Sequence, residues 1–390
     1  MNFLKKWFFK PKIKPETITC ENHDFSLKKV EKNAQRVLNS LDKCGYDAYL
    51  VGGVIRDQLS GIKSKDCDVA TNAKPEKIVQ KIKGSIIIGR RFRIVHARFG
   101  RQIIEISTFR SSSRHISAKG IIKRDNVYGS IEDDVMRRDF TINALYFRYK
   151  DQCILDFVGG MDDLKHKRLK SIGDPLERFP EDPVRMIRAV RFTAKLGLTI
   201  DDEIISAIKK HKTLLTEVSG QRLFAELIKV YYSGCAESAN KLLNEFGLME
   251  TLIPGVSKLR RKKDAMLLWH TMAANADKRY KSNRRLSVTY LFACIYWPMM
   301  AEKMSKLRMK HFSIKIADEV LSHANIDIPL RVKEDIFEIW KNQYGFKLKE
   351  KAPGALLNSK RLRASYELLS QRAMIDSHLT DVALYWETHV

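Results

Sequence analysis

Hydrophobic and polar positions follow two different patterns along this chain. Up to about residue 160, short apolar runs such as 48–51 and 102–108 predict strands, and stretches with helical spacing, such as 26–44, lie among them. From about Asp162 the strand-type runs vanish, and amphipathic helices with short breaks continue to the end. The pattern therefore predicts strands mixed with helices first, and helices alone after them.

The first predicted strand leads into a turn of two glycines. The apolar run Ala48–Val51 reaches Gly52 and Gly53, after which a helix is predicted. Two glycines let the backbone approach a ligand closely, and the free N–H groups at the start of a helix suit phosphate. A lone Gly-Gly is usually an ordinary tight turn, so it indicates a phosphate site only in combination with a second motif.

Two aspartates stand about a dozen residues later. If residues 66–69 form a strand, the side chains of Asp66 and Asp68 point to the same face. Two carboxylates next to a phosphate-binding turn can hold Mg²⁺ ions that bridge a triphosphate and an attacking hydroxyl. A lone Asp-x-Asp is usually a solvated loop, but the two motifs in this order predict phosphoryl or nucleotidyl transfer.

Three further strands are predicted at 85–89, 92–99 and 102–108. Glu105 stands in the last of these strands, which is otherwise apolar. Its carboxylate is either on the solvent face of an edge strand or a third member of the metal cluster. His96 lies in an apolar strand, which is more typical of a buried structural histidine than of a catalyst.

Arginines mark two further segments of this part of the chain. Arg91, in Gly89-Arg-Arg-Phe-Arg93, suits phosphate, although a solvated basic hairpin is an equal alternative. Arg138 and Asp139 stand at the head of a predicted helix, with Asn143 one turn beyond on the same face. An acid at a helix head is commonly a cap, but the neighbouring arginines and Asn143 make a ligand-facing site more plausible.

A helix beginning at Glu181-Asp-Pro marks the boundary of the helical part, near residues 170–180. Pro183 suits the first helical turn, so Asp182 is the expected cap. Arg185, Arg188 and Arg191 then recur every three residues. Such a helix can face a nucleotide, and the alternative is a salt-bridged surface helix.

Charge changes this picture by pointing to a polyanionic partner. The 390 residues include 71 Lys or Arg and 46 Asp or Glu, a formal net charge of +25, and nucleic acid is a more plausible partner than a membrane surface. Residues 254–315 hold fifteen Lys or Arg against three acids, which makes this segment the candidate RNA track. Its candidate RNA-binding residues are Arg260, Arg261, Lys262, Lys263, Arg284 and Arg285.

Cysteine usage and hydropathy indicate the compartment. The six cysteines form no C-x-x-C pair, and reduced thiols in the cytoplasm are the default interpretation. No run of about 18 uncharged apolar residues is present, so we expect no transmembrane helix. Residues 1–25 carry five lysines by residue 15 and are expected to be a basic, flexible arm.

The motifs resemble those of the class II nucleotidyltransferases of the polymerase β type, which comprise tRNA CCA-adding enzymes and bacterial poly(A) polymerases. The matching segments stand in the family's order across roughly residues 30–250: Leu50-Val-Gly-Gly-Val-Ile-Arg-Asp57, Asp66 with Asp68, Arg137-Arg-Asp139, and Glu181-Asp-Pro-Val-Arg185. Residues 87–96, 125–132, 157–164 and the tail through Trp386 resemble the poly(A) polymerase branch. The arginine- and proline-rich extension common in that branch is not seen before Val390, so RNA affinity is expected to rest on 254–315 and the N-terminal arm.

The resemblance implies an α+β fold, in which a polymerase β-type domain with a small mixed sheet precedes a helical neck, body and tail. The expected boundaries are 1–25 for the arm, 26–170 for the catalytic head, 171–250 for the neck and 251–390 for the body and tail. It also implies template-independent addition of AMP from ATP to RNA 3′ ends, with release of pyrophosphate. The alternatives are a tRNA CCA-adding enzyme and a catalytically silent RNA-binding protein on the same scaffold. We expect a monomer.

The resemblance further implies roles for single residues. Asp66 and Asp68 would bind two Mg²⁺ ions, for which Mn²⁺ can substitute, and Asp139 matches a further essential acid. Glu105 is the rival of Asp139 as third metal-site carboxylate. The implied nucleotide-binding residues are Gly52, Gly53, Arg56, Arg91, Arg138, Asn143, Asp182, Arg185 and Arg188, of which Asp182 and Arg185 would read the base edge, because adenine offers a donor and an acceptor.

Overall fold

A computed structural model describes the chain over residues 14–64, 67–89, 93–111, 115–116, 122–124, 127–259, 262–309, 311–347 and 354–390, with the backbone alone at 115–116 and 122–124. It divides into two compact units, which we describe separately. Unit 1 comprises Met1–Asp182 and Leu198–Ala207, and unit 2 comprises Pro183–Gly197 and Ile208–Val390. The finer division into arm, head, neck and body stays a prediction.

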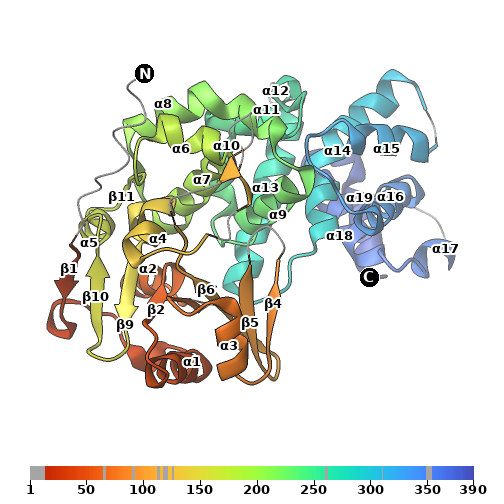
Figure 1. Ribbon diagram of the computed structural model, residues 1–390. Helices are drawn as coiled ribbons and strands as arrows, with labels where there is room; N and C mark the ends of the chain where they lie inside the picture. Colours follow the sequence, from red (N-terminus) through yellow and green to blue (C-terminus); the bar gives the residue numbers. More distant parts are fainter. Residues whose placement is uncertain are drawn as a thin grey trace. The chain divides into compact units, whose positions relative to one another are not determined.

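Unit 1 is built on an eight-stranded mixed sheet (Figure 1). The order across the sheet is β1 (Glu16–Ile18), β10 (Cys153–Asp156), β9 (Leu145–Arg148), β2 (Ala48–Val51), β3 (Asp68–Thr71), β6 (Gln102–Thr108), β5 (Ile94–Phe99) and β4 (Ser85–Ile88). Strands β3 and β6 pair in parallel, whereas the other neighbours in this sheet pair antiparallel. The expected mixed sheet with helices is confirmed.

Helices α1 (Lys32–Lys43), α2 (Gly53–Leu59) and α3 (Pro75–Lys81) cover one face of this sheet. Their apolar residues form a buried cluster with Leu50, Val69, Ile104 and Ile106, because these strand positions all point to that face. Each such side chain contributes about 1.5–3 kcal/mol when it is fully buried. This core fixes the strands that carry the candidate site on the opposite face.

The opposite face of the sheet is covered only in part. Around β2, β9 and β10 it packs against α4 (Ile131–Arg137), and Val51, Ala70, Tyr146 and Val135 share a second buried cluster there. Toward β6 and β4 the same face is open, since Ile103 and Ile86 are 45% and 44% exposed. The candidate site lies between the covered and the open part.

The predicted helix after Asp139 is wrong. Helix α4 precedes this segment. The Ser130 and Asp133 side chains form a capping box that starts α4 at Ile131, and the helix ends at Arg137. Asp139 lies in the following turn, and a single 3₁₀ turn, η4 (Thr141–Asn143), leads into β9. Strand β3 also begins at Asp68 instead of residue 66.

The prediction that Asp182 caps the next helix is wrong as well. Helix α6 (Pro175–Glu181) is capped by the Asp174 side chain, which accepts a hydrogen bond of 2.8 Å from the Leu176 N–H. Asp182 is the C-cap residue of α6, and α7 (Val184–Leu196) begins after Pro183. A short parallel ladder of β11 (Arg168–Leu169) with β12 (Thr199–Ile200) also interrupts the predicted helical run.

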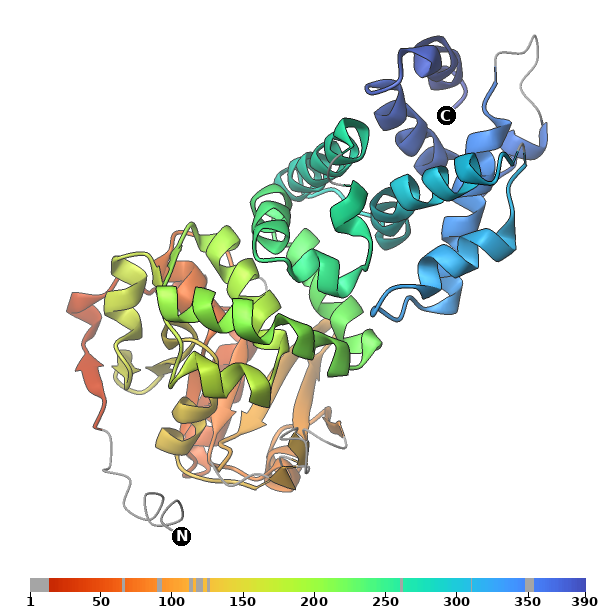
Figure 2. The same ribbon diagram turned by 90° about the horizontal axis from the view of Figure 1, so that it is seen from above.

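Unit 2 is helical throughout the part of it that the structure describes (Figure 2). After α8 (Asp202–His211), which begins in unit 1, and the 3₁₀ segment η5 (Lys212–Glu217), its helices are α9 (Gly220–Tyr231), α10 (Ala236–Glu245), α11 (Leu248–Leu252), α12 (Val256–Leu259), α13 (Lys263–Lys281), α14 (Val288–Lys306), α15 (Ile314–Ser322), α16 (Leu330–Gly345), α17 (Gly354–Leu357), α18 (Leu362–Ala373) and α19 (Thr380–Glu387).

Helix α14 lies at the centre of this unit and is buried over most of its length. The indoles of Trp269 and Trp340 donate to its Ile295 and Ala293 carbonyls at 2.9 and 3.1 Å. Trp269 and Tyr290 are therefore core residues, with 4% and 1% exposure. All six cysteines are free thiols, and among the described residues no helix is long and apolar enough to cross a membrane.

Candidate active site of unit 1

A row of side chains crosses the sheet of unit 1 at the start of β3. In the strand register, Asp68 lies beside Val51 of β2 on one side and Glu105 of β6 on the other. Glu105 in turn lies beside His96 of β5. Because residues paired in register point to the same face, Asp68, Glu105 and His96 all project from the partly open face.

Strand β6 lies between β3 and β5, so the predicted edge strand is wrong, whereas the metal role of Glu105 stays a prediction. Its side chain is 54% exposed, as on a solvent face, and it also stands directly beside Asp68. Its Oε1 atom lies 3.3 Å from Nε2 of His96, whose side chain is only 18% exposed. The parallel pairing of β3 with β6 thus brings a second acid to Asp68 from a distant part of the chain.

The glycine turn adjoins this row at the end of β2. Gly52 has φ 69° and ψ −117°, a conformation that side-chain-bearing residues rarely adopt, and its N–H bonds the Leu145 carbonyl at 3.3 Å. Helix α2 begins at Gly53, as predicted. A Cβ atom at Gly52 would lie 3.6 Å from both Nη1 of Arg138 and the Asn143 carbonyl oxygen, so the 138–143 segment packs against the turn.

Arg56 links helix α2 to the 138–143 segment by a hydrogen bond. Its Nη1 donates to Oδ1 of Asn143 at 2.5 Å, and its Nε donates to Oδ1 of Asp57 at 2.9 Å, with both Arg56 and Asp57 only 4% exposed. Asn143 donates from Nδ2 to Oδ1 of Asp139 at 2.9 Å, and the Phe140 N–H bonds the same oxygen at 2.9 Å. Asp139 is therefore held by a chain of hydrogen bonds that starts on α2.

Arg138 lies on the other side of the glycine turn, in a buried polar group. Its guanidinium donates to Tyr146 OH at 2.7 Å, to the Asn143 carbonyl at 3.2 Å and to Asp134 at 3.1 Å. Burial and the Asp134 carboxylate raise the pKa of Tyr146 well above its usual range, although Arg138 opposes this shift. The phenol thus stays protonated and donates to Asp134 at 2.7 Å.

Sequence reasoning did not single out Asp134 and Tyr146. Asp134 and Arg138 are four positions apart and form an ion pair, so their spacing was an available signal. Tyr146 belongs to the apolar β9 run, and nothing in its local sequence distinguishes it from a core aromatic residue. Both residues support Arg138, which approaches the Gly52 turn within contact distance.

Several predicted site residues are not assembled here. Asp66 and Arg91, like Arg260 and Arg261 of the RNA track, lie outside the described residues. Within the part that is described, no group of three or more His, Cys, Asp or Glu side chains is arranged to hold a metal ion. Of the base-reading set, Asp182 belongs to unit 1, whereas Arg185 and Arg188 belong to α7 of unit 2.

On α7 itself the arginines take different positions. Arg185 is buried, with 6% exposure, whereas Arg188 and Arg191 are half-buried. Their guanidinium carbons lie 5.1 and 4.4 Å from the ring centroid of Phe192, which is cation–π distance. The expectation of a plain salt-bridged surface helix does not describe the buried Arg185.

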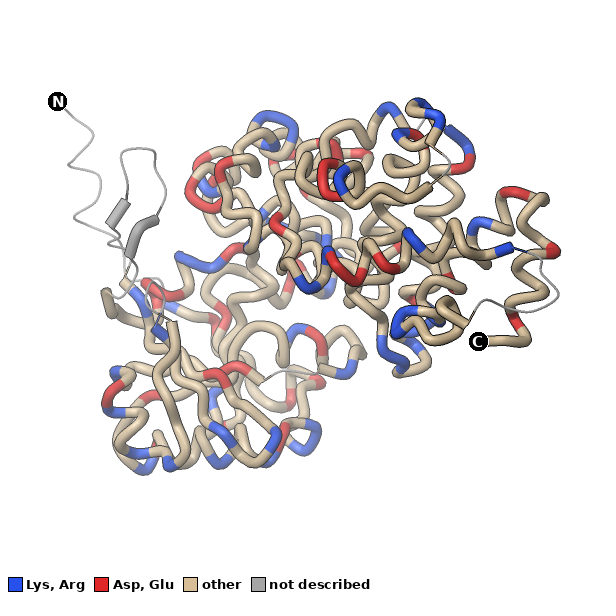
Figure 3. The backbone as a smooth tube through the Cα atoms, turned by 90° about the vertical axis from the view of Figure 1, so that its right-hand side faces the viewer, with Lys and Arg blue, Asp and Glu red and all other residues tan. Residues whose placement is uncertain are grey.

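Positive charge is spread along both units, with acids between the basic residues (Figure 3). In unit 2, Lys262 and Lys263 are exposed at the start of α13, and Lys262 pairs with Glu302 at 3.2 Å. Beyond the other end of α13, Arg284 and Arg285 are also exposed. All four described candidates for RNA contact therefore lie at the protein surface.

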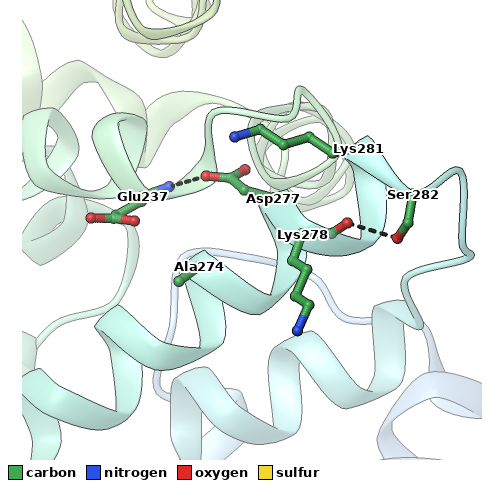
Figure 4. Close-up of a pocket in the computed structure, with 6 residues that line it drawn as sticks. All are labelled: Glu237, Ala274, Asp277, Lys278, Lys281 and Ser282. Atoms are coloured by element: carbon green, nitrogen blue, oxygen red, sulfur yellow. Dashed lines mark hydrogen bonds between the residues drawn. The ribbon is translucent and has the colours of Figure 1, made fainter.

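A groove of about 600 Å³ lies between α10 and α13. Lys241 and Lys281 line it together with Asp277. The Asp277 carboxylate accepts hydrogen bonds from the Ala236 and Glu237 N–H groups at 2.6 and 3.1 Å and so occupies the start of α10 (Figure 4). Because this acid satisfies the helix start internally, the start of α10 does not add free N–H groups at Ala236 and Glu237 to the groove.

Family models of known proteins match most of the chain. "Poly A polymerase head domain" matches residues 48–170, which include the whole described site of unit 1. "Probable RNA and SrmB- binding site of polymerase A" matches 197–259. "Polymerase A arginine-rich C-terminus" matches 313–390, where this chain has four arginines: Arg331, Arg361, Arg363 and Arg372.

Curated relatives extend over almost the full length. Poly(A) polymerase I of Escherichia coli O157:H7 is 38% identical over 392 residues, which cover 95% of this chain and 84% of that protein. Poly(A) polymerase I of Haemophilus influenzae is 36% identical and covers 95% and 87%. The CCA-adding enzyme of Bacillus pumilus is 36% identical, but over only 57% of this chain and 55% of that enzyme.

Solved structures share the fold. The CCA-adding enzyme of Bacillus stearothermophilus in complex with CTP superposes with a TM-score of 0.66 at 24% identity, covering 92% of this chain and 81% of that chain. The CCA-adding enzyme of Thermotoga maritima complexed with tRNA gives 0.57 at 20% identity, covering 92% and 80%. At this level of identity the likeness concerns the fold alone.

Proposed function

This chain belongs to the family of bacterial poly(A) polymerases, and from that premise we propose that its unit 1 site transfers AMP from ATP to the 3′ end of RNA without a template, releasing pyrophosphate. The observation that carries this function is the identity of 36–38% with poly(A) polymerase I proteins over 95% of the chain. The charge of +25 supports the same conclusion, because RNA is a polyanion.

The carboxylates fit a magnesium site. Asp68 and Glu105 present acidic oxygens side by side on one sheet face, which is the donor type that Mg²⁺ prefers. We assign Asp66, Asp68 and Glu105 as the residues that hold two Mg²⁺ ions, or Mn²⁺ in their place. When bound, such ions lower the pKa of an attacking hydroxyl and neutralise charge on the triphosphate.

Asp139 takes a different role in this proposal. Its carboxylate is 8% exposed and is engaged by the Phe140 N–H and the Asn143 amide. Those contacts support a role in shaping the ribose side of the nucleotide site, with Glu105 in place of Asp139 as third metal-site carboxylate. Asn143 and Arg138 would hold the same segment against the glycine turn.

The remaining nucleotide contacts are assigned to the turn and the arginines. The backbone at Gly52 and Gly53 lets phosphates approach closely, and Arg56, assigned to the same phosphates, bonds Asn143 and so holds helix α2 to the 139–143 segment. Arg91 is assigned to phosphate as well. Asp182 and Arg185 would recognise the adenine edge, with Arg188 assisting, because a carboxylate accepts from the amino group and a guanidinium donates to a ring nitrogen.

RNA is assigned to the basic residues of unit 2. The exposed Lys262, Lys263, Arg284 and Arg285 can bind backbone phosphates whatever the base sequence, and Arg260 and Arg261 belong to the same proposed track. The enzyme is further proposed to work as a monomer in the cytoplasm.

The deciding experiment compares nucleotides and acceptors. The full chain is incubated with Mg²⁺, labelled oligoadenylate and each of the four nucleoside triphosphates separately, and product length is followed on a gel. Long tails with ATP alone support the proposal. A parallel incubation with tRNA, CTP and ATP that stops after C-C-A would identify a CCA-adding enzyme instead, and RNA binding without incorporation would identify a silent RNA-binding protein.

A further inference from the structure

We propose that His96 positions Glu105 for metal binding by donating a hydrogen bond from Nε2 to Oε1, which leaves Oε2 for the metal ion. The inference rests on the proposed function, since it takes Glu105 as a metal ligand. It assigns a task to a histidine that the sequence pattern presented as a structural core residue. Strand register, burial of the ring and the chemistry of the pair each support it.

The register makes His96 and Glu105 cross-strand neighbours. They are directly paired between β5 and β6, so their Cβ atoms are neighbours on one face of the sheet. Asp68 stands on the other side of Glu105 in the same row. Glu105 therefore lies between an imidazole and the aspartate with which it would share a metal ion.

The ring nitrogen requires a hydrogen-bond partner, and opposite a carboxylate it is the N–H form of Nε2 that can bond. Nε2 of His96 is buried, and within the described part of the chain it makes no aligned hydrogen bond. A buried donor left unsatisfied is unfavourable, because it has lost its bond to water. Oε1 of Glu105 lies 3.3 Å away, and a small rotation of the glutamate side chain would complete the bond. Catalytic hydrogen bonds are often long before ligands bind and then tighten.

The side chain of Glu105, in turn, has to be ordered to bind a metal ion. This side chain is 54% exposed, and a free glutamate loses rotamer entropy when a metal ion orders it. A hydrogen bond to one carboxylate oxygen fixes the other and removes part of that cost. Partners of this kind typically change metal affinity by about 10–100-fold when they are replaced.

A purely space-filling histidine would be expected to behave differently. On its other side His96 is paired with Ile86 of the edge strand β4, so an apolar side chain is compatible with the same row. If packing alone were its purpose, His96→Leu would preserve metal binding. If donation to Glu105 is its purpose, His96→Gln should work better than His96→Leu, because the glutamine amide keeps a donor near the position of Nε2.

The test measures Mn²⁺ binding to the full chain by electron paramagnetic resonance, with a non-hydrolysable ATP analogue present. We expect His96→Leu to weaken Mn²⁺ affinity about 10-fold or more, and His96→Gln to recover most of it. A matched control is His270→Leu, because His270 also faces a glutamate, Glu237, at 3.6 Å but lies in unit 2 and is 59% exposed. The control should bind Mn²⁺ like the wild-type protein.

The variant Glu105→Gln separates the two proposals. If it loses Mn²⁺ affinity while His96→Leu keeps it, the positioning role of His96 is overturned and the metal role of Glu105 stands. If Glu105→Gln binds Mn²⁺ normally, or the wild-type protein binds none, both the metal role and the positioning role fail. Thermal unfolding of each variant, measured in parallel, identifies a loss that comes from unfolding, and a His96→Leu chain that is folded with unchanged affinity rejects the inference.

Discussion

Arg56 and Asn143, 87 positions apart in the chain, are joined by a hydrogen bond of 2.5 Å from Nη1 to Oδ1. One end of this bond lies on helix α2, just after the glycine turn, and the other lies in the 3₁₀ turn that precedes β9. Asn143 in turn donates a hydrogen bond of 2.9 Å from Nδ2 to Oδ1 of Asp139. The glycine-turn motif and the Arg138–Asn143 motif, which are far apart in the sequence, therefore form one hydrogen-bonded assembly.

Replacing Arg56 by lysine should uncouple this assembly. A single ammonium group cannot bond both Asn143 and Asp57 in the fixed geometry of a guanidinium, so we expect a loss of about 1–3 kcal/mol in the free energy of unfolding. Displacement of the 139–143 segment should also lower kcat/KM for ATP about 10-fold or more. Urea unfolding and initial rates check these values. Arg36→Lys is the control, because Arg36 bonds an asparagine too, but at the exposed surface, and its effect should stay within about 0.5 kcal/mol.

The glycine turn makes a prediction about backbone conformation. Gly52→Ala leaves room for the new methyl group, whose nearest neighbours would be 3.6 Å away, but places a side-chain-bearing residue at φ 69° and ψ −117°. We expect about 1–3 kcal/mol of strain and a large loss of ATP affinity, measured by unfolding and by equilibrium binding. Gly45→Ala provides the comparison, since Gly45 also has a positive φ, of 78°, and open space around it. That variant should lose stability but keep ATP affinity, and equal ATP affinity in both would remove the turn from the site.

The double variant Asp66→Ala/Asp68→Ala should abolish AMP incorporation and leave RNA affinity nearly unchanged. The reason is that these carboxylates are assigned to the metal ions, whereas RNA phosphates are assigned to unit 2. Primer extension and filter binding measure the two properties on the same preparation. Asp42→Asn, an exposed substitution on α1, should extend the primer normally. Incorporation by the double variant at the wild-type rate would show that the metal site lies elsewhere.

RNA binding should depend on salt in a way that reports on Arg284 and Arg285. If both contact phosphates, Arg284→Gln/Arg285→Gln lowers the slope of log affinity against log salt concentration by about 1.4, because each phosphate contact on a single strand adds about 0.7. Fluorescence anisotropy with oligoadenylate at several salt concentrations gives the slope. Lys28→Gln/Lys29→Gln removes the same charge from two exposed positions of unit 1 and should change the slope little. If the two double variants show the same salt slope, Arg284 and Arg285 do not contact RNA phosphates.

Glu250 predicts a pH dependence of stability. Burial raises the pKa of its carboxyl group, but hydrogen bonds from the Gly255 and Ser257 N–H groups, at 2.9 and 2.7 Å, outweigh this and lower the pKa below its ordinary value of 4.5. A lowered pKa in the folded state stabilises the protein above the unfolded-state pKa, and that stabilisation disappears as pH falls through the folded-state value. Glu250→Gln should therefore unfold about 1–2 kcal/mol more easily at pH 7.

The free energies of unfolding of wild type and Glu250→Gln, compared at low pH, test whether the carboxylate charge is the cause. As pH falls below 4.5 and through the lowered folded-state pKa, the difference between wild type and Glu250→Gln should shrink, because the wild-type carboxylate becomes protonated. Denaturant titrations at several pH values measure it. A difference that stays constant across this range would mean that the carboxylate charge contributes nothing to these hydrogen bonds.

Elements with strong local signals could be predicted from the sequence. Strand β6 begins and ends where its apolar run does, and β2 with the Gly52 turn into α2 was also placed correctly. Two of the errors, at Asp139 and at Asp182, came from competing local signals. Asp174-Pro175 and Asp182-Pro183 present the same start signal, and the chain uses the first one. Before Asp139, the capping box at Ser130 and Asp133 was the stronger signal and was overlooked.

The site depended on pairings that no local signal contains. Glu105 was recognised as a candidate, but only the parallel register of β3 with β6 brings it next to Asp68. Likewise, Tyr146 reaches Arg138 and Asp134 because β9 lies beside β2, a relation set by the whole sheet. Residue types and spacings therefore predicted the ingredients of the site, and long-range strand pairing determined its geometry.

The parallel pairing of β3 with β6 also determines when, during synthesis of the chain, Asp68 and Glu105 come together. A parallel pair requires the chain to leave the sheet and return, and here α3, β4 and β5 are made in between. Such long-range contacts form late, since the entropy of closing the loop is lost before any contact compensates for it. A nascent chain that has emerged only as far as β5 thus has Asp68 without Glu105. If Glu105 has the proposed metal role, adenylate transfer requires that β6 has left the ribosome and paired with β3.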